Sequence, residues 1–185
     1  MLKKFIPDVY ASTIYDISYT KLYESGKRLI LTDLDNTLIS YKETDPTQEL
    51  YKWKEEVMAL GFEIIIVSNS KKHRVEHFAE LLGLKYVKFA KKPLKSGFKK
   101  AVKIAEKKYK KEEIIEFGDQ VMTDVFGSRR CGFTTYLFKA IDKKTEKRVT
   151  RFNRKLENII LKLIKKKYPN LFEEKLSLYL KERDN

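Results

Sequence analysis

Hydrophobic and polar positions follow one another along the chain in blocks that are typical of a parallel α/β sheet. Short apolar runs, each typical of a strand that is buried on both faces, recur at residues 28–33, 62–67, 86–90, 113–117 and 133–138. Segments with helical spacing of their apolar residues follow the first four runs, at residues 47–60, 71–82, 93–109 and 121–130. Strands that alternate with helices of this length predict an α/β fold with a parallel sheet of about five strands and right-handed crossovers.

The α/β pattern covers about residues 26–140 and leaves an extension at each end. We expect a helical N-terminal extension over residues 1–25 and a basic, amphipathic helical extension over residues 141–185. Within residues 147–167, apolar side chains recur at steps of three and four, at Val149, Phe152, Leu156, Ile159, Ile160 and Leu163. This stripe either lies on an anionic membrane or packs against the protein's own core, and the sequence leaves both alternatives open.

Charge is concentrated in the second extension. The 185 residues include 40 Lys and Arg against 26 Asp and Glu, which gives a formal net charge of +14. Residues 139–167 hold 12 of the basic side chains and three acidic ones, so most of the excess lies there. A localised basic segment predicts a polyanionic partner, which is either nucleic acid or anionic lipid.

Two absences from the sequence narrow the class of protein. Cys131 is the only cysteine, which excludes an intrachain disulfide and any multi-cysteine zinc or iron–sulfur site within one chain. No apolar stretch approaches the roughly 18–20 residues that a membrane-spanning helix needs. We therefore expect a protein of the reducing cytoplasm.

Polar residues follow the predicted strands at the points where a parallel sheet binds its ligands. Several acids, two small polar residues and a lysine occupy these positions, namely Asp33, Asp35, Ser68, Asn69, Lys92, Asp119 and Asp124. Acids gathered at one edge repel each other unless a cation lies between them, and all-oxygen ligands suit Mg²⁺. A hydroxyl, backbone amides and a lysine around that cation suit a phosphoryl group. The residues alone thus predict metal-assisted phosphoryl chemistry.

The order of these residues resembles the haloacid dehalogenase-like (HAD) phosphohydrolases. Residues 33–37, Asp-Leu-Asp-Asn-Thr, match the first motif of that superfamily, Asp-x-Asp-x-Thr. Ser68 stands at the second motif, Lys92 before Pro93 at the third, and Asp119 with Asp124 at the fourth. Further detail, including Thr-Arg-Phe-Asn at residues 150–153, is similar to the YqeG-type subgroup of class IIIA phosphatases, which resembles the phosphatidylglycerophosphate (PGP) phosphatases of mitochondria and plastids. The resemblance covers about residues 1–160 and implies a Rossmann-like HAD fold.

The resemblance also implies a role for each residue. Asp33 is expected to be the nucleophile that forms an aspartyl-phosphate, and Asp35 the general acid and base. The Asp33 carboxylate, the Asp35 backbone carbonyl and Asp119 are expected to hold Mg²⁺, with help from Asp124. The phosphoryl group is expected to be bound and stabilised by Ser68, Lys92, Thr37 and the backbone around Leu34 and Asn69.

The spacing of the motifs bears on the substrate. Thr37 and Ser68 are only 31 positions apart, and Ser68 and Lys92 only 24, so neither gap leaves room for a cap domain. An uncapped site suits a phosphate carried on something too large to enclose. We expect a Mg²⁺-dependent lipid phosphatase, acting on PGP, that lies peripherally on the inner face of the membrane through residues 147–167. The alternatives are a phosphatase of a nucleic-acid end, nucleotide or phosphoprotein, and a non-catalytic binding protein associated with RNA or the ribosome.

One further motif is set aside. Residues 73–77 spell His-Arg-Val-Glu-His, which matches the helix of an inverted zinc protease. A zinc site needs a third protein ligand, and the neighbouring sequence already accounts for another active site. We interpret both histidines as surface residues of a charged helix.

Overall fold

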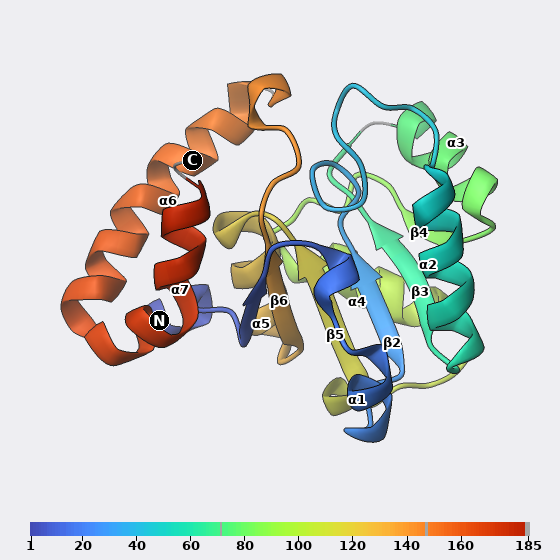
Figure 1. The fold of residues 1–185 in the computed structure, drawn as a ribbon, viewed down its shortest axis with the longest axis horizontal. Coiled ribbons are helices and arrows are strands. Elements are labelled where there is room, and N and C mark those ends of the chain that lie inside the picture. The colour runs from blue at the N-terminus through green and yellow to red at the C-terminus, as the bar shows by residue number, and fades with distance from the viewer. Residues whose placement is uncertain (71, 147, 184–185) are drawn as a thin grey trace.

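A parallel sheet forms the centre of the molecule (Figure 1). The computed structural model describes residues 1–70, 72–146 and 148–183. Within these residues the sheet has six strands in the order β1-β6-β5-β2-β3-β4, and all pairs are parallel. The strands are β1 (Val9–Ala11), β2 (Leu29–Thr32), β3 (Glu63–Val67), β4 (Lys85–Val87), β5 (Ile114–Gly118) and β6 (Thr134–Phe138). The predicted α/β fold is confirmed, with one strand more than the sequence pattern indicated.

The burial of the three central strands, β2, β3 and β5, explains why their sequences are continuous apolar runs. Every residue of β2 and β5 is buried, as is all of β3 after its first residue. Alternate residues face opposite layers, so that Ile30 belongs to one core cluster and Leu31 to another. In the register of β2 and β5, Thr32 lies opposite Phe117, and the Asp33 amide donates to the Phe117 carbonyl at 2.8 Å. This register sets Asp33 beside the end of β5.

Helices cover both faces of the sheet. Helices α2 and α3 pack with β2 and β3 in one core cluster, and α4 packs on the opposite face, behind the sheet in Figure 1. The elements between the strands are α1 (Tyr19–Glu24), α2 (Gln48–Ala59), α3 (Lys72–Leu82), α4 (Lys95–Ile104), a 3-10 turn (Lys111–Glu113), a π-helical turn (Val121–Val125) and α5 (Phe126–Cys131). The predicted helix over 71–82 begins at residue 71, which lies outside the described residues.

The N-terminal extension is not purely helical. It contains two 3-10 turns (Leu2–Phe5 and Ile14–Asp16), α1 and the short strand β1, which pairs with β6 so that Tyr10 lies opposite Leu137. Three residues are too few to show the alternation by which a strand is recognised, which explains why β1 escaped prediction. The N-terminal segment therefore contributes the edge strand of the sheet.

The C-terminal extension forms two packed helices, α6 (Arg148–Lys167) and α7 (Pro169–Arg183), after a 3-10 turn (Lys143–Thr145). Their inner faces join a core cluster with the N-terminal turn, to which Phe5, Leu161, Ile164, Leu176 and Tyr179 contribute. Residue 147, the predicted start of the basic helix, lies outside the described residues. No helix among the described residues is long and apolar enough to cross a bilayer.

The predicted apolar stripe of α6 faces away from this core for most of its length. The side chains of Val149, Phe152, Ile159 and Leu163 are 72%, 60%, 57% and 46% exposed, and Ile160 alone of the predicted stripe packs partly against the cluster. The alternative in which the whole stripe packs on the protein's own core is therefore wrong. The face that packs inward instead carries buried charges, which a search for apolar periodicity passes over.

Candidate active site

The first motif lies in a tight loop directly after β2. Asn36 has a left-handed backbone (φ 67°), and its amide donates to the Ile39 carbonyl at 2.6 Å. Asparagine tolerates this conformation better than most residues, which fits its place between Asp35 and Thr37. The side-chain oxygen of Asn36 accepts a hydrogen bond from the Asp142 amide at 3.1 Å, which ties the loop to the segment that leads into α6.

Asp35 is oriented by two side chains from the second motif region. The Arg74 Nε donates to Asp35 Oδ1 at 2.7 Å, and the Ser70 hydroxyl donates to Asp35 Oδ2. Arg74 also donates to the carbonyl of Ser40, so the guanidinium joins α3 to the loop after the first motif. The carboxyl group predicted to act as acid and base is thus held at a fixed angle.

Lys92 bridges two of the predicted site carboxylates. Its Nζ lies 2.6 Å from Asp33 Oδ1 and 2.6 Å from Asp124 Oδ1, and its side chain is 2% exposed. Burial lowers the pKa of the Lys92 ammonium, but the carboxylates of Asp124 and Asp33 raise it by more, so the amine stays protonated. The Asn69 side chain fixes the Lys92 backbone, accepting from its amide at 2.7 Å and donating to its carbonyl at 3.0 Å.

Asp124 reaches Lys92 because β5 ends in glycine. The Asp124 Oδ2 accepts from the Gln120 amide at 3.0 Å, which closes the π-helical turn around the carboxylate. A Cβ built on Gly118 falls well inside van der Waals distance of the Cβ and carboxyl carbon of Asp124. The glycine of the fourth motif therefore makes the space that the Asp124 side chain occupies.

We expect Gly118→Ala to lower phosphatase activity at least about tenfold, because the added methyl group displaces Asp124 from Lys92. The measurement is kcat on a soluble phosphomonoester beside the thermal unfolding midpoint. Gly83→Ala is the control for adding a methyl group, since a Cβ at Gly83 meets no atom within 4 Å, although its positive φ makes some strain there unavoidable. Activity equal to wild type in the folded Gly118→Ala protein would contradict the prediction.

The carboxylates crowd one another strongly. Burial raises the pKa of the Asp33 carboxyl well above its usual range, Lys92 lowers it, and Asp124, Asp119 and Asp35 raise it again. Burial likewise raises the pKa of Asp119 to about 7, although Arg154 opposes the shift. Lys92 offsets only part of this negative charge, so the site favours a further cation.

A buried carboxylate oxygen without a hydrogen-bond partner among the described residues is also present. Asp119 is fully buried, and its Oδ1 has no hydrogen-bond partner among the described residues, while its Oδ2 is paired. Among the described residues no three Asp, Glu, His or Cys side chains form a ready-made ligand cluster. Mg²⁺ usually keeps several waters and takes only one or two carboxylates, so the pair Asp33 and Asp119 fits that ion.

Arg154, on α6, holds the other half of Asp119. Its Nη1 donates to the Asp119 carbonyl at 2.7 Å, and its Nη2 pairs with Asp119 Oδ2 and with Glu146 Oε1, the latter at 2.9 Å. Glu157, on the same helix and fully buried, accepts from the Val121 amide at 3.1 Å and pairs with Arg183 at 2.9 Å. The C-terminal helices are therefore attached to the fourth motif through buried charges.

These residues surround a cavity of about 260 Å³ at the carboxyl ends of the strands. Its described walls are Asp33, Asp35, Tyr41, Ser68, Asn69, Ser70, Lys92, Gln120, Thr123, Asp124, Val149, Thr150 and Asn153. Most of the predicted site residues are thus brought together. Leu34, Thr37 and Asp119 are not among the described walls: Leu34 is buried, and Thr37 lines a neighbouring cavity beside Leu38 and Ile39. Asp119 is fully buried and pairs with Arg154.

Sequence reasoning missed the residues that act through neighbours. Ser70 and Arg74 orient Asp35, and Arg154 holds Asp119, yet none of the three belongs to a motif that was assigned a role. The only available signal was position, because Ser70 follows the second motif and Arg154 follows the Thr-Arg-Phe-Asn segment. A basic side chain in a lysine-rich helix is normally solvated, and nothing in the sequence distinguishes Arg154 from Lys155.

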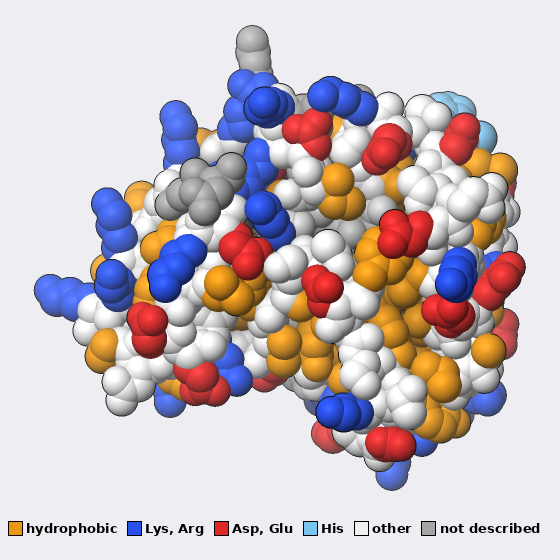
Figure 2. Space-filling model, in the orientation of Figure 1, with side chains coloured by type: hydrophobic (Ala, Val, Ile, Leu, Met, Phe, Trp, Pro, Cys, Tyr) orange, Lys and Arg blue, Asp and Glu red, His pale blue; other side chains and the backbone are white. Residues whose placement is uncertain are grey.

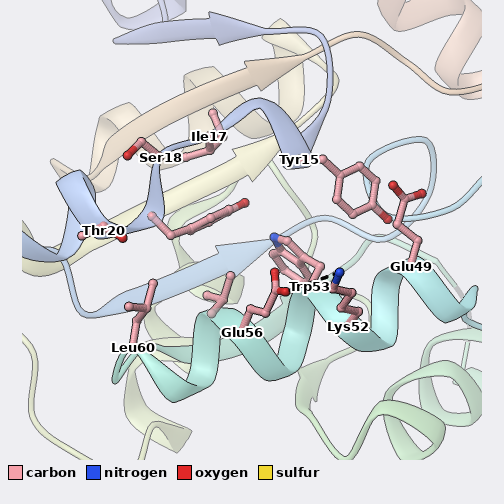
Figure 3. Close-up of a pocket in the computed structure, with 11 residues that line it drawn as sticks. Tyr15, Ile17, Ser18, Thr20, Glu49, Lys52, Trp53, Glu56 and Leu60 are labelled. Atoms are coloured by element: carbon pink, nitrogen blue, oxygen red, sulfur yellow. Dashed lines mark ion pairs between the residues drawn. The ribbon is translucent and has the colours of Figure 1, made fainter.

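A larger cavity of about 430 Å³ lies elsewhere, between the N-terminal extension and α2 (Figure 3). Tyr15 and Trp53 line it, and its polar side chains include the exposed ion pair of Lys52 and Glu56 at 3.8 Å. None of the predicted site residues is among its described walls. It is an open groove without convergent chemistry, and the smaller cavity is the candidate active site.

His77 and Glu76, in the His-Arg-Val-Glu-His segment of α3, have other partners. His77 Nε2 lies 2.7 Å from Asp45 Oδ1, and Glu76 accepts a hydrogen bond from the Tyr86 hydroxyl at 2.7 Å. His73 and His77 are both exposed. Their exposure agrees with the interpretation of both histidines as surface residues of a charged helix.

Comparisons with known proteins agree with this geometry. Residues 2–142 match a family model described as mitochondrial PGP phosphatase. A curated protein of Bacillus subtilis strain 168, the probable phosphatase YqeG, is 39% identical over 175 residues, which cover 94% of this chain and all of that protein. The family match ends before α6, whereas the relative from Bacillus extends across it.

One solved structure supports the fold. An uncharacterised protein from Listeria monocytogenes serotype 4b superposes with a TM-score of 0.50 at 16% identity, covering 63% of this chain and 84% of that one. The putative HAD-hydrolase YfnB from Bacillus subtilis, solved with magnesium, reaches a TM-score of 0.46 at 14% identity over 72% of this chain and 98% of its own, too distant to carry an inference.

Proposed function

Because the chain belongs to the PGP phosphatase family, and is a phosphatase of the HAD type, we propose that it hydrolyses the terminal phosphate of PGP with the help of Mg²⁺. The observation that carries the chemistry is the convergence of Asp33, Lys92 and Asp124 within ion-pair distance in one cavity. The alternative of a non-catalytic binding protein has no support in this arrangement, since each catalytic position is filled by the residue type that the reaction needs.

Asp33 is the proposed nucleophile. Its carboxylate attacks phosphorus, the bond to the leaving alkoxide breaks, and an aspartyl-phosphate forms on Asp33. Lys92 places a fixed positive charge 2.6 Å from Oδ1, which lowers the pKa of Asp33 and opposes the larger rise that burial and the neighbouring carboxylates cause. The same ammonium faces the charge that develops on the transferring phosphoryl oxygens, which is the arrangement that stabilises such a transition state.

Asp35 is the proposed general acid and base. It donates a proton to the departing oxygen of the lipid and then takes one from the water that attacks the aspartyl-phosphate, so the two steps return it to its starting state. Arg74 and Ser70 fix its carboxyl group, and the same wall of the cavity carries Ser68. The Ser68 hydroxyl is the proposed donor to the phosphoryl group.

Mg²⁺ would be held by Asp33 and the free Oδ1 of Asp119, with the Asp35 backbone carbonyl as the expected third protein ligand. When bound, the ion neutralises the phosphoryl oxygens and the acid cluster. Asp124 pairs with Lys92, whose Nζ lies 2.6 Å from Oδ1, and its expected help at the metal stays a prediction.

The form of the site supports the proposal of a lipid substrate. Between the first and third motifs the described residues form only α2, β3, α3, β4 and their connections, so no cap domain closes the cavity. One wall is instead built by Val149, Thr150 and Asn153, at the start of the basic helix α6. Residues 147–167, where described, offer both positive charge and exposed apolar side chains to a membrane beside the cavity.

We expect the purified protein to release phosphate from PGP in mixed micelles at least about tenfold faster than from water-soluble phosphomonoesters, and EDTA to stop both reactions. The test compares kcat/KM for PGP, a mononucleotide and a 5′-phosphorylated RNA, each with Mg²⁺ or EDTA. Metal-dependent release from the RNA or mononucleotide in preference to PGP would favour the alternative substrates. Release that persists in EDTA would contradict the role of the metal.

A further inference from the structure

The outward face of α6 combines two properties that rarely occur together on a surface without a partner. Val149, Phe152, Ile159 and Leu163 all project into solvent along one side of the helix. In a straight α-helix, residues 149 and 163 lie about 21 Å apart, so the stripe is long enough to contact an extended surface. Exposed apolar side chains gathered in this way mark sites of interaction.

Positive charge flanks the stripe without opposing charge. The exposed basic side chains of the helix are Arg151, Lys155, Lys162, Lys165, Lys166 and Lys167. Glu157 is the only acidic residue between residues 148 and 167, and it is fully buried. Figure 2 shows Lys and Arg side chains spaced along the edge of the molecule over α6, with apolar side chains between them. The partner must therefore be anionic and must also accept aliphatic and aromatic groups.

The stripe begins at the candidate active site. Val149 is both its first member and a wall of the catalytic cavity. From the other edge of the sheet, Phe89 follows β4, and its amide donates to the carbonyl of Ser70, another wall of that cavity, at 3.4 Å. Phe89 is 52% exposed and has a left-handed backbone (φ 49°), an uncommon conformation for an aromatic residue. Exposed apolar residues thus lie on both sides of the cavity.

We propose that α6 lies flat on an anionic bilayer, with Phe152, Ile159 and Leu163 inserted among the headgroups, so that the catalytic cavity opens at the level of the lipid phosphates. The proposal rests on the proposed function and adds the docking surface and orientation to it. A nucleic acid would satisfy the basic side chains but leave the apolar stripe in water. An amphipathic helix at a bilayer interface uses both. In this orientation Val149, which belongs to the stripe and lines the cavity, lies next to the membrane.

The test uses flotation of the full-length protein with phosphatidylcholine vesicles that contain or lack phosphatidylglycerol. The variant Phe152→Ser/Ile159→Ser/Leu163→Ser removes the stripe without touching a cavity wall. The matched control, Met58→Ser/Leu81→Ser/Leu178→Ser, alters three exposed apolar residues on α2, α3 and α7. We expect the stripe variant to bind anionic vesicles at least about 30-fold more weakly than wild type, and the control to bind like wild type.

A charge variant separates the two properties of the surface. Lys155→Glu/Lys162→Glu is expected to weaken binding to anionic vesicles at least about tenfold, with no loss on purely zwitterionic vesicles. Both variants should keep wild-type hydrolysis of a soluble phosphomonoester and wild-type thermal unfolding, because neither alters the cavity or the core. Hydrolysis of PGP in vesicles should fall together with binding.

Three outcomes would overturn the docking proposal. The first is equal vesicle binding by the stripe variant and the control. The second is a wild-type protein that proves to be a dimer and becomes a monomer on the stripe substitutions. The third is salt-sensitive binding of RNA by a protein that does not bind vesicles. Failure of the proposed function is distinguishable from these. A protein that binds anionic vesicles through the stripe but releases no phosphate from PGP in micelles has the docking surface and a different substrate.

Discussion

Asp33→Asn is expected to reduce phosphate release at least about 1000-fold while the protein stays folded. An amide oxygen cannot form the aspartyl-phosphate, so the covalent route closes entirely. The fold tolerates the change because Asn has the same shape, and Lys92 keeps Asp124 as a partner at 2.6 Å. Removing one of several crowded carboxylates also relieves repulsion, so the thermal midpoint should equal or exceed that of wild type.

The measurement is single-turnover phosphate release from a soluble phosphomonoester, with circular dichroism to confirm the fold. Asp45→Asn is the matched control, since Asp45 is an exposed acid in the loop before α2 and contacts only His77 among the described pairs. It should retain wild-type activity. Residual release by Asp33→Asn within tenfold of wild type would assign the nucleophile to another group or to water.

Arg154→Ala is expected to cost about 3–5 kcal/mol of unfolding free energy, although Arg154 belongs to none of the matched motifs. Its removal leaves Asp119 and Glu157, both fully buried, without the guanidinium that lies between them. The penalty is that of uncompensated buried charge. Activity should fall as well, because Asp119 is no longer held with one oxygen free.

Urea unfolding measured by far-ultraviolet circular dichroism tests this directly. Lys155→Ala is the matched control, because Lys155 is the exposed neighbour on the same helix and should change the free energy of unfolding by less than about 0.5 kcal/mol. Arg154→Lys keeps the charge but cannot reproduce the forked contact with Asp119, and we expect an intermediate loss. Wild-type stability in Arg154→Ala would show that the ion-pair network is dispensable.

The catalytic motifs were predictable because they depend on position along a strand. A run such as residues 62–67 predicts a buried strand, and the polar residue that follows must then lie at the carboxyl edge of the sheet. Ser68, Lys92 and Asp124 accordingly reach one cavity although more than 50 residues separate the first from the last. The family resemblance supplied their roles, which composition and spacing alone could not.

The orientation of α6 was not predictable in this way. Its apolar residues form the more regular stripe, and burial of such a stripe is the usual outcome for a helix. The structure instead buries Arg154 and Glu157, because each finds partners on other elements, at Asp119 and at Val121. Whether a charge is buried depends on distant partners, and one sequence does not display them.

The attachment of the C-terminal helices has a consequence for how the enzyme is made. Asp33, Lys92 and Asp119 are all translated before α6 and α7. The cavity wall that α6 supplies, and the Arg154 partner of Asp119, are in place only once those helices have docked. The hydroxyl of Tyr10, in the first strand, likewise has its partner only after α7 has docked, since it donates to Glu182 at 2.7 Å. A nascent chain that carries every proposed catalytic residue therefore lacks part of the cavity wall until α6 and α7 have docked.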